Sequence, residues 1–342
     1  MIIGPGELGR FAAGSRLFAT GAAESSYRLV LDWAGSVIGR GVPVVAAGAL
    51  AGETVCVAVS LVGSTTALGE QLPAGDEPVR AVRALERRLG EPVGAVVALN
   101  LAAENALLPL VAAALLGVPL VDGDGTGRVF PLVEQTTYTL GGVSATPLAL
   151  AGGGGELVVL ETAPDRVEAV VRPLVLAMGG WAVGACYPMS ARELAGAMVP
   201  GTVGRLLEAG APGADRAVAA PYGMKTLCRG VIAAVEGSSG HGADLELPSL
   251  PSSIVVEETG GLRRLVRLEA HNEIVLALAD GAPVAMAPDL ICLVSAVDQL
   301  VVDVDKAAPG MEVEVMVVRA APVWHTERGQ ELGGVRAFGV PL

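Results

Sequence analysis

Hydrophobic positions alternate between helical spacing and short apolar runs from residue 7 to about residue 215. The helical stretches have apolar side chains on one side at intervals of three and four residues. They are residues 7–20, 26–39, 77–89, 104–117, 165–177 and 191–198. The short apolar runs predict buried strands, at residues 54–61, 93–99, 118–121 and 156–161. Strands that alternate with helices favour an α/β domain with a largely parallel sheet.

The pattern of hydrophobic and turn residues changes after about residue 215. From Pro221 onward, short β-rich runs alternate with turn residues, which is typical of a sandwich or barrel. A chain of 342 residues is long enough for about two domains. We therefore predict an α/β domain over residues 1–215, which carries the candidate site, and a β-rich domain over residues 220–342.

Composition and charge narrow the function classes. Hydrophobic residues make up 52% of the chain and charged residues 17%, which excludes intrinsic disorder. The net charge of −13, without a local Lys/Arg cluster, argues against binding of nucleic acid. The apolar run 105–121 is interrupted by two prolines and a glycine and is shorter than the ~20 residues of a membrane-spanning helix.

The N-terminal segment and the cysteines predict a cytoplasmic location. Glu7 precedes any apolar stretch, so we expect no signal peptide. The four cysteines lie far apart and form no Cys-x-x-Cys pair, which indicates reduced thiols.

The segment VDGDGTGRVFP at residues 121–131 is the strongest candidate for a ligand site. It follows a predicted strand, so Asp122, Asp124, Thr126 and Arg128 would emerge at the strand's carboxyl end, where open α/β sheets bind ligands. A glycine-rich turn with self-capping aspartates is the structural alternative. A calcium loop fits less well because the twelfth position is Val133, and a phosphate loop of the actin-like ATPase type lacks an evident second phosphate loop.

Glu104 and Asn105 follow another predicted strand at the same sheet edge. Their structural role would be to cap the helix that they begin. Their functional role would place Glu104 beside Asp122 or Asp124, where two crowded carboxylates share a proton or activate water. The sequence leaves both roles open.

Other motifs carry less weight. Gly4–Gly9 matches Gly-x-Gly-x-x-Gly, but only three residues precede it, whereas a dinucleotide site needs a full strand there. His241, His271 and His325 have no metal-ligand spacing, so we expect no histidine-based metal site. The sequence requires no cofactor, although a divalent metal remains compatible with it. No nucleophile motif supports a covalent Ser or Cys mechanism.

Several segments together resemble the S-methyl thiohydantoin desulfurase family of bacterial proteins, which are associated with hydantoinase- and oxoprolinase-type enzymes. These segments are GEQLPAGDEPVRAVRALERRLG, ENALLPLVAAALLGVPLVDGDGTGRVFP, GGVSATPLALA, YPMSARELAGAMVPGTVGRLLEAG, AHNEIVLALADGAPVAMAPDLI and APVWHTERGQELGGVRAFG. The resemblance implies an α/β N-terminal domain and a β-rich C-terminal domain. It also implies hydrolysis of a small S-methylated thiohydantoin ring to a hydantoin, with release of methanethiol.

The resemblance also implies site residues. It carries over Asp122, Asp124, Arg128 and Asn105, with Arg128 suited to a substrate carboxylate or ring carbonyl. We expect one carboxylate of the Asp122/Asp124 pair to act as general base and the other to fix the loop or the substrate, with Glu104 as a third catalytic candidate. The expected substrate-binding residues are Arg128, Asn105, Thr126, Thr20 and Gly21.

One departure from the family opens an alternative function. The family has a glycine run followed by Asp-Pro near the N-terminus, where this chain has residues 20–25, TGAAES. Alanine at two glycine positions restricts positive φ and close approach of a ligand. The chain would then be a non-catalytic ligand-binding or partner subunit of a hydantoinase-type enzyme. We expect a small-molecule substrate, and either a second copy of the chain or a hydantoinase-type chain as partner.

Overall fold

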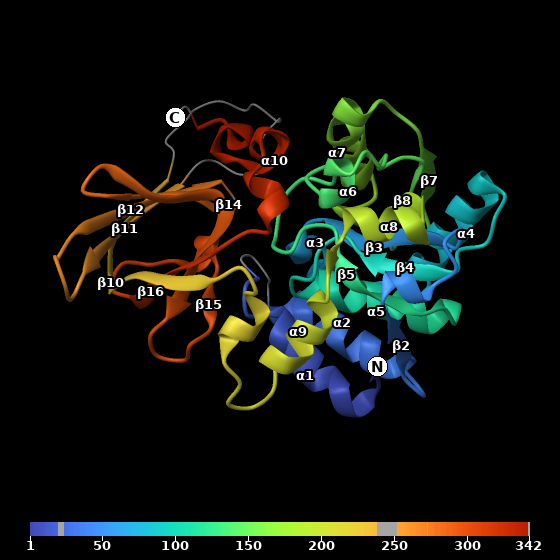
Figure 1. The fold of residues 1–342 in the computed structure, drawn as a ribbon, viewed down its shortest axis with the longest axis horizontal. Coiled ribbons are helices and arrows are strands. Elements are labelled where there is room, and N and C mark those ends of the chain that lie inside the picture. Colours follow the sequence, from blue (N-terminus) through green and yellow to red (C-terminus); the bar gives the residue numbers. More distant parts are fainter. Residues whose placement is uncertain (20–23, 238–251, 272, 341–342) are drawn as a thin grey trace. The chain divides into compact units, whose positions relative to one another are not determined.

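A computed structural model describes residues 1–19, 24–237, 252–271 and 273–340, which form two compact units (Figure 1). The first unit begins at Met1 and runs to Ala219, and the second begins at Ala220. Leu17, Phe18 and Ala19 group with the second unit. Each unit has its own sheet.

The described residues of the first unit form a nine-stranded sheet in the order β1-β2-β5-β4-β3-β8-β6-β7, with β9 paired to β5. The strands are β1 (Ile2–Ile3), β2 (Val42–Val45), β3 (Val55–Gly63), β4 (Ala95–Ala98), β5 (Leu120–Asp124), β6 (Leu148–Ala151), β7 (Leu157–Leu160), β8 (Trp181–Ser190) and β9 (Val199–Pro200). The central strands β2, β5, β4 and β3 pair in parallel. The flanking strands pair antiparallel. The predicted α/β fold is confirmed, and antiparallel strands widen the sheet on both sides of its parallel centre.

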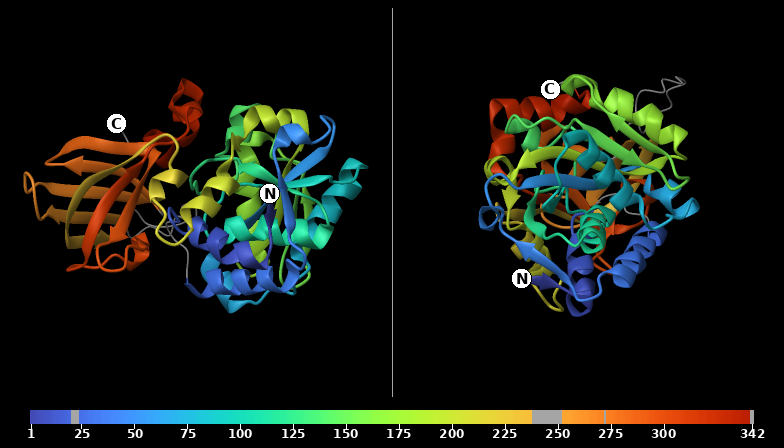
Figure 2. Two further views of the ribbon diagram at one scale, coloured as in Figure 1. Left: turned by 60° about the horizontal axis from the view of Figure 1, so that its bottom comes forward. Right: turned by 90° about the vertical axis from the view of Figure 1, so that its right-hand side faces the viewer.

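Helices cover both faces of this sheet, with α6, α7 and α8 on one face and α1, α2 and α5 on the other (Figures 1 and 2). The helices are α1 (Pro5–Ser15), α2 (Glu24–Val37), α3 (Thr65–Glu70), α4 (Glu77–Leu89), α5 (Glu104–Leu116), α6 (Thr137–Leu140), α7 (Val167–Ala177), α8 (Ala191–Ala197) and α9 (Thr202–Ala209). Left-handed Gly90 and Gly117 end α4 and α5, where the sequence predicts helix ends. A capping box of Ser190 and Glu193 starts α8.

The first predicted helix is shorter than the sequence pattern indicates. It ends at Ser15 rather than at residue 20, and Phe18 packs in a cluster with Leu290 and Cys292 of the second unit's sheet. The Gly-x-Gly-x-x-Gly motif opens α1 after a two-residue strand at the sheet edge. It therefore lacks the central parallel strand that a dinucleotide site needs.

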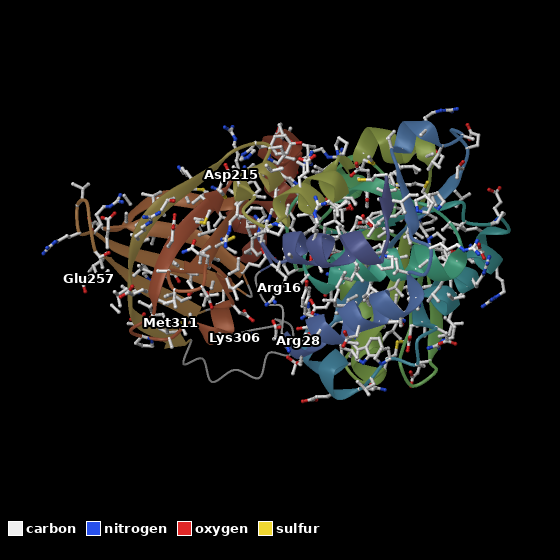
Figure 3. All side chains as sticks on the ribbon, turned by 90° about the horizontal axis from the view of Figure 1, so that it is seen from below. Arg16, Arg28, Asp215, Glu257, Lys306 and Met311 are labelled. Carbon is white, nitrogen blue, oxygen red and sulfur yellow. The ribbon has the colours of Figure 1, made fainter. Side chains whose placement is uncertain are left out.

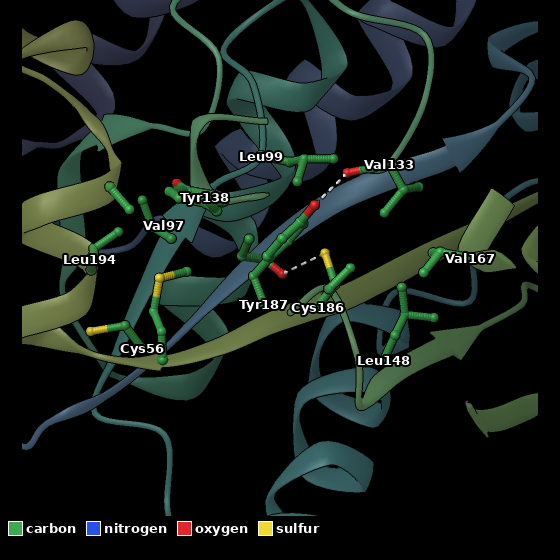
Figure 4. Packing of buried hydrophobic residues seen from close by; sticks show 14 of the residues in the cluster. Cys56, Val97, Leu99, Val133, Tyr138, Leu148, Val167, Cys186, Tyr187 and Leu194 are labelled. Atoms are coloured by element: carbon green, nitrogen blue, oxygen red, sulfur yellow. Dashed lines mark hydrogen bonds between the residues drawn. The ribbon is translucent and has the colours of Figure 1, made fainter. Parts of the chain in front are cut away.

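Small apolar side chains fill the core on one face of the first sheet. Cys56 and Ala58 of β3 and Val97 of β4 pack in one cluster with Val167 of α7 and Leu194 of α8 (Figure 4). The small side chains of Cys56 and Ala58 let the helices approach the sheet closely.

The described strands of the second unit form a closed antiparallel barrel. The ring runs β13-β12-β11-β10-β16-β14 and closes by pairing of β13 with β14, while β15 extends β14. The strands are β10 (Met224–Gly237), β11 (Ser252–Glu258), β12 (Leu265–His271), β13 (Glu273–Ala279), β14 (Ala282–Ser295), β15 (Val301–Val302) and β16 (Glu312–Val318). Helix α10 (Glu327–Gly333) follows them. The predicted β-rich domain is confirmed, and closure removes the free edges that an open sheet would expose.

Candidate functional site

The strand that carries the candidate loop extends three residues further than predicted. β5 ends at Asp124 rather than at Val121, and Asp124 lies opposite Ala98 of β4. The short strand β9 supplies the reason, because Val199 and Pro200 pair with Asp124 and Gly123. Both aspartates therefore lie in the strand, and the loop itself begins at Gly125.

Asp124 holds the loop in shape. Its carboxylate is buried, and Oδ1 accepts hydrogen bonds from the backbone N–H groups of Thr126 and Gly127, both at 2.6 Å. Burial raises the pKa of Asp124, and the hydrogen bonds from Gly127 and Thr126 act in the opposite direction. This arrangement includes the self-capping turn that the sequence offered as a structural alternative.

Asp122 is directed to a helix rather than into the loop. Its Oδ1 accepts a hydrogen bond of 3.1 Å from the backbone N–H of Gly204, in the first turn of α9. Its carbonyl oxygen accepts another, of 2.9 Å, from Gly201, the residue before α9. The residue before the helix is a glycine, so Asp122 supplies from β5 the side-chain acceptor that a cap residue normally provides.

Thr126 and Arg128 complete the loop. The Thr126 hydroxyl lies 3.0 Å from Asp124 Oδ1 and also contacts the carbonyl oxygen of Arg128. The Arg128 guanidinium is mostly buried, stacks 4.2 Å above the centre of the Phe130 ring, and donates from Nε to the Val129 carbonyl at 2.7 Å. Stacking holds the guanidinium in one plane. A planar guanidinium can donate paired hydrogen bonds to a carboxylate or hydrogen-bond a ring carbonyl.

The turn between β4 and α5 ties three elements together. Ala103 has a φ of 47°, in the left-handed region that a non-glycine residue rarely adopts. The following Asn105 accepts hydrogen bonds through Oδ1 from the Leu61 N–H at 2.8 Å and the Ser60 hydroxyl at 2.9 Å, both in β3. Asn105 thus anchors the start of α5 to the neighbouring strand.

Glu104 pairs with a residue that sequence reasoning missed. Its carboxylate Oε1 accepts a 2.5 Å hydrogen bond from the hydroxyl of Ser26 in α2, and both residues are buried. In the sequence Ser26 is an ordinary polar residue in the first turn of an amphipathic helix. No local pattern could have linked it to Glu104, because the two lie 78 positions apart.

Two buried tyrosines, also missed from the sequence, bind backbone carbonyl groups near the loop (Figure 4). The Tyr138 hydroxyl donates to the carbonyl oxygen of Ala98, where β4 ends, at 2.9 Å. The Tyr187 hydroxyl donates to the Val133 carbonyl at 3.0 Å and lies 2.7 Å from the Thr139 hydroxyl. They fix the chain that follows the loop.

The predicted site residues therefore occupy two turns at one sheet edge. Asp124 ends β5 and Thr126 and Arg128 lie in the turn after it, while Glu104 and Asn105 begin α5 directly after the turn that follows β4. These strands are adjacent and parallel, so their carboxyl ends share an edge. Asp122 is part of the same strand end but binds α9. Thr20 and Gly21 lie outside the described residues.

In the described ranges, no group of three or more His, Cys, Asp or Glu side chains is arranged to hold a metal ion. None of the helices described has the length and apolar character needed to cross a membrane.

Comparisons with known proteins place this geometry in a family. The model of the S-Me-THD-like N-terminal domain matches residues 6–162, and that of the S-Me-THD-like C-terminal domain matches residues 162–342. A crystal structure of a protein from Chromobacterium violaceum is 24% identical, covers 97% of this chain and 95% of its own, and has a TM-score of 0.77. At that identity it shows the fold alone. A search of curated proteins gives no match. The two domain models together span nearly the whole chain, which therefore belongs to the S-Me-THD-like family, as the sequence motifs predict.

Proposed function

We propose that this protein is a hydrolase acting on a small cyclic ureide-like ring of the S-methyl thiohydantoin type. The observation that carries the proposal is the pair of turns at one sheet edge, which holds two buried carboxylates and a stacked arginine in a chain of the S-Me-THD-like family. Carboxylates can activate water, and a planar guanidinium can orient a ring carbonyl.

The reaction needs one base and one proton donor. Water attacks the amidine-like ring carbon, and the base takes a proton from that water as the new C–O bond forms. The C–S bond then breaks, the sulfur leaves with a proton as methanethiol, and the ring carbon becomes the carbonyl of a hydantoin. Because water supplies the oxygen and both protons, the step needs no oxidant or reductant.

Among the three candidate carboxylates, Glu104 is our choice for the base. Asp122 caps α9, and Asp124 Oδ1 already accepts two backbone hydrogen bonds that shape the loop. Glu104 begins α5, where the helix dipole favours an ionised carboxylate. Arg128 then orients the ring, and Asn105 keeps the Glu104 turn against β3.

The test is to incubate the purified protein with S-methyl thiohydantoin and measure methanethiol and hydantoin together. We expect the two products in equal amounts and in proportion to the amount of enzyme. A thermal shift with this ring but no product would favour the alternative, a ligand-binding or partner subunit. If the ring gives neither product nor thermal shift, both functions are contradicted.

A further inference from the structure

Ser26 and Glu104 form a buried hydroxyl–carboxylate pair between the starts of two helices. Ser26 lies in the first turn of α2 and Glu104 is the first residue of α5. Ser26 is 0% exposed and Glu104 is 3% exposed, and the distance from Oγ to Oε1 is 2.5 Å. That distance is within the range of charge-assisted O–H···O⁻ hydrogen bonds, which are roughly 2.5–2.7 Å long.

An aromatic residue and two arginines lie close to Ser26 at the start of α2. Tyr27, next to Ser26 in α2, has a pKa raised to about 12, chiefly by burial and in part by the charge of Glu104. Arg16 stacks 4.7 Å above the Tyr27 ring and pairs with Glu24 at 2.7 Å. Arg28 also binds Glu24, so both arginines gather at the start of α2 (Figure 3). The positive end of α5 adds a favourable field at Glu104 itself.

We propose that Ser26 is a positioning residue that orients Glu104 and keeps it ionised for its role as general base. The inference rests on the proposed function, because it gives Glu104 a partner in that chemistry. A buried carboxylate that loses one of its hydrogen-bond donors loses part of the stabilisation of its charged form. The hydroxyl of Ser26 supplies such a donor from a different helix.

The first experiment compares pH profiles of kcat/KM on S-methyl thiohydantoin for the wild type, Ser26→Ala and Ser26→Thr. Loss of the donor should move the acidic limb of the profile to higher pH by about one unit. Ser26→Ala is therefore expected to lose about tenfold in kcat/KM below that limb and to approach the wild type well above it. Ser26→Thr keeps a hydroxyl and should restore the wild-type limb.

Ser36→Ala is the matched control. Ser36 lies in the same helix, is exposed, and donates to the Trp33 carbonyl of that helix at 2.7 Å. Its removal should leave the profile unchanged. If Ser26→Ala lowers kcat/KM by the same factor at every pH, Ser26 merely supports the fold and the inference is overturned.

A second measurement does not depend on turnover. Urea unfolding at neutral pH gives the destabilisation caused by Ser26→Ala, first with Glu104 present and then in the Glu104→Gln background. We expect a smaller loss in the second case, because a neutral amide oxygen accepts a weaker hydrogen bond than a carboxylate. Equal losses in the two backgrounds would overturn the inference whatever the enzyme does. Unequal losses in a protein without activity on this ring would support the pair and contradict the proposed function.

Discussion

Protonation of Glu134 should contribute to the pH dependence of stability. This residue follows Val133, in the segment that Tyr187 holds in place. Its Oε2 is buried and has no hydrogen-bond donor among the described residues. Burial raises the pKa of Glu134 to about 7, the nearby Glu168 carboxylate adds to the rise, and Arg172 opposes it.

The sign of the effect follows from this shift. In the unfolded chain a glutamate releases its proton near its ordinary pKa of 4.5, whereas folded Glu134 keeps it to about pH 7. Stability should therefore fall as the pH rises from about 4.5 to 7 and then level off, with a cost of roughly 1–3 kcal/mol.

Glu134→Gln removes this titration. The variant should be more stable relative to the wild type at pH 8 than at pH 4.5, by up to about 3 kcal/mol in urea-unfolding experiments. Glu91→Gln, at an exposed glutamate, provides the control. The same stability difference at both pH values would show that Glu134 does not titrate as described.

At the scale of elements, the turn after β5 depends on Gly125. Its N–H donates to the Leu99 carbonyl at 3.0 Å, and its carbonyl oxygen accepts the Thr137 N–H at 2.5 Å. A Cβ at this position would lie 2.5 Å from Tyr138 Cε2 and 3.0 Å from the Leu99 oxygen. The ring of Tyr138 is fully buried and cannot move aside without displacing its neighbours.

Gly125→Ala should therefore destabilise the protein by about 1–3 kcal/mol and shift the loop that carries Arg128. Gly196→Ala, in α8, is the matched control, because nothing lies within 4 Å of the added methyl group. Its effect on the free energy of unfolding should have the opposite sign. We expect this substitution to stabilise the protein by up to about 1 kcal/mol. Comparable free energies of unfolding for both variants would contradict the packing described for the loop.

Local signals in the sequence predicted many helices and strands, but not all of the strand pairings and hydrogen bonds between them. Pro78 and Gly90 mark the ends of α4, and the apolar runs mark β3, β4 and β5. The end of β5 could not be predicted, because its last residues are paired by β9, a segment far along the chain. The Ser26–Glu104 hydrogen bond and the two tyrosine hydroxyls are long-range contacts of the same kind. In contrast, Asp124, Thr126 and Arg128 are close in sequence, so the turn that they form could be predicted from the local sequence.

At the scale of the whole molecule, each unit encloses two of the four cysteines. Cys56 and Cys186 lie in the first sheet, Cys228 and Cys292 in the barrel, and all four are buried thiols that form no disulfide. Burial raises the pKa of Cys56 and Cys186 to about 12 and that of Cys228 to about 11. Thiolates are the reactive form, so these thiols should be inert in the folded protein.

Thiol labelling followed by peptide mass spectrometry tests this arrangement. In native buffer at pH 8 we expect slow labelling at every cysteine, and in guanidinium chloride rapid labelling of all four. Unfolding of either unit alone would expose its own pair. Stoichiometric labelling at the start of the native reaction would contradict the buried positions. Slow labelling also leaves a low protein background for detecting methanethiol with a thiol reagent.

On the proposed function, the sheet edge at the turns after β4 and β5 hydrolyses an S-methylated ring with Glu104 as base. The most direct measurement is the rate of methanethiol release from S-methyl thiohydantoin by the wild type, Glu104→Gln and Asp122→Asn. A positioned base contributes roughly 10²–10⁴-fold, so Glu104→Gln should lose at least about 10²-fold while keeping its fold. Asp122→Asn retains an acceptor for the α9 cap and should lose less than about tenfold. Full turnover by Glu104→Gln, or a larger loss in Asp122→Asn, would contradict the account.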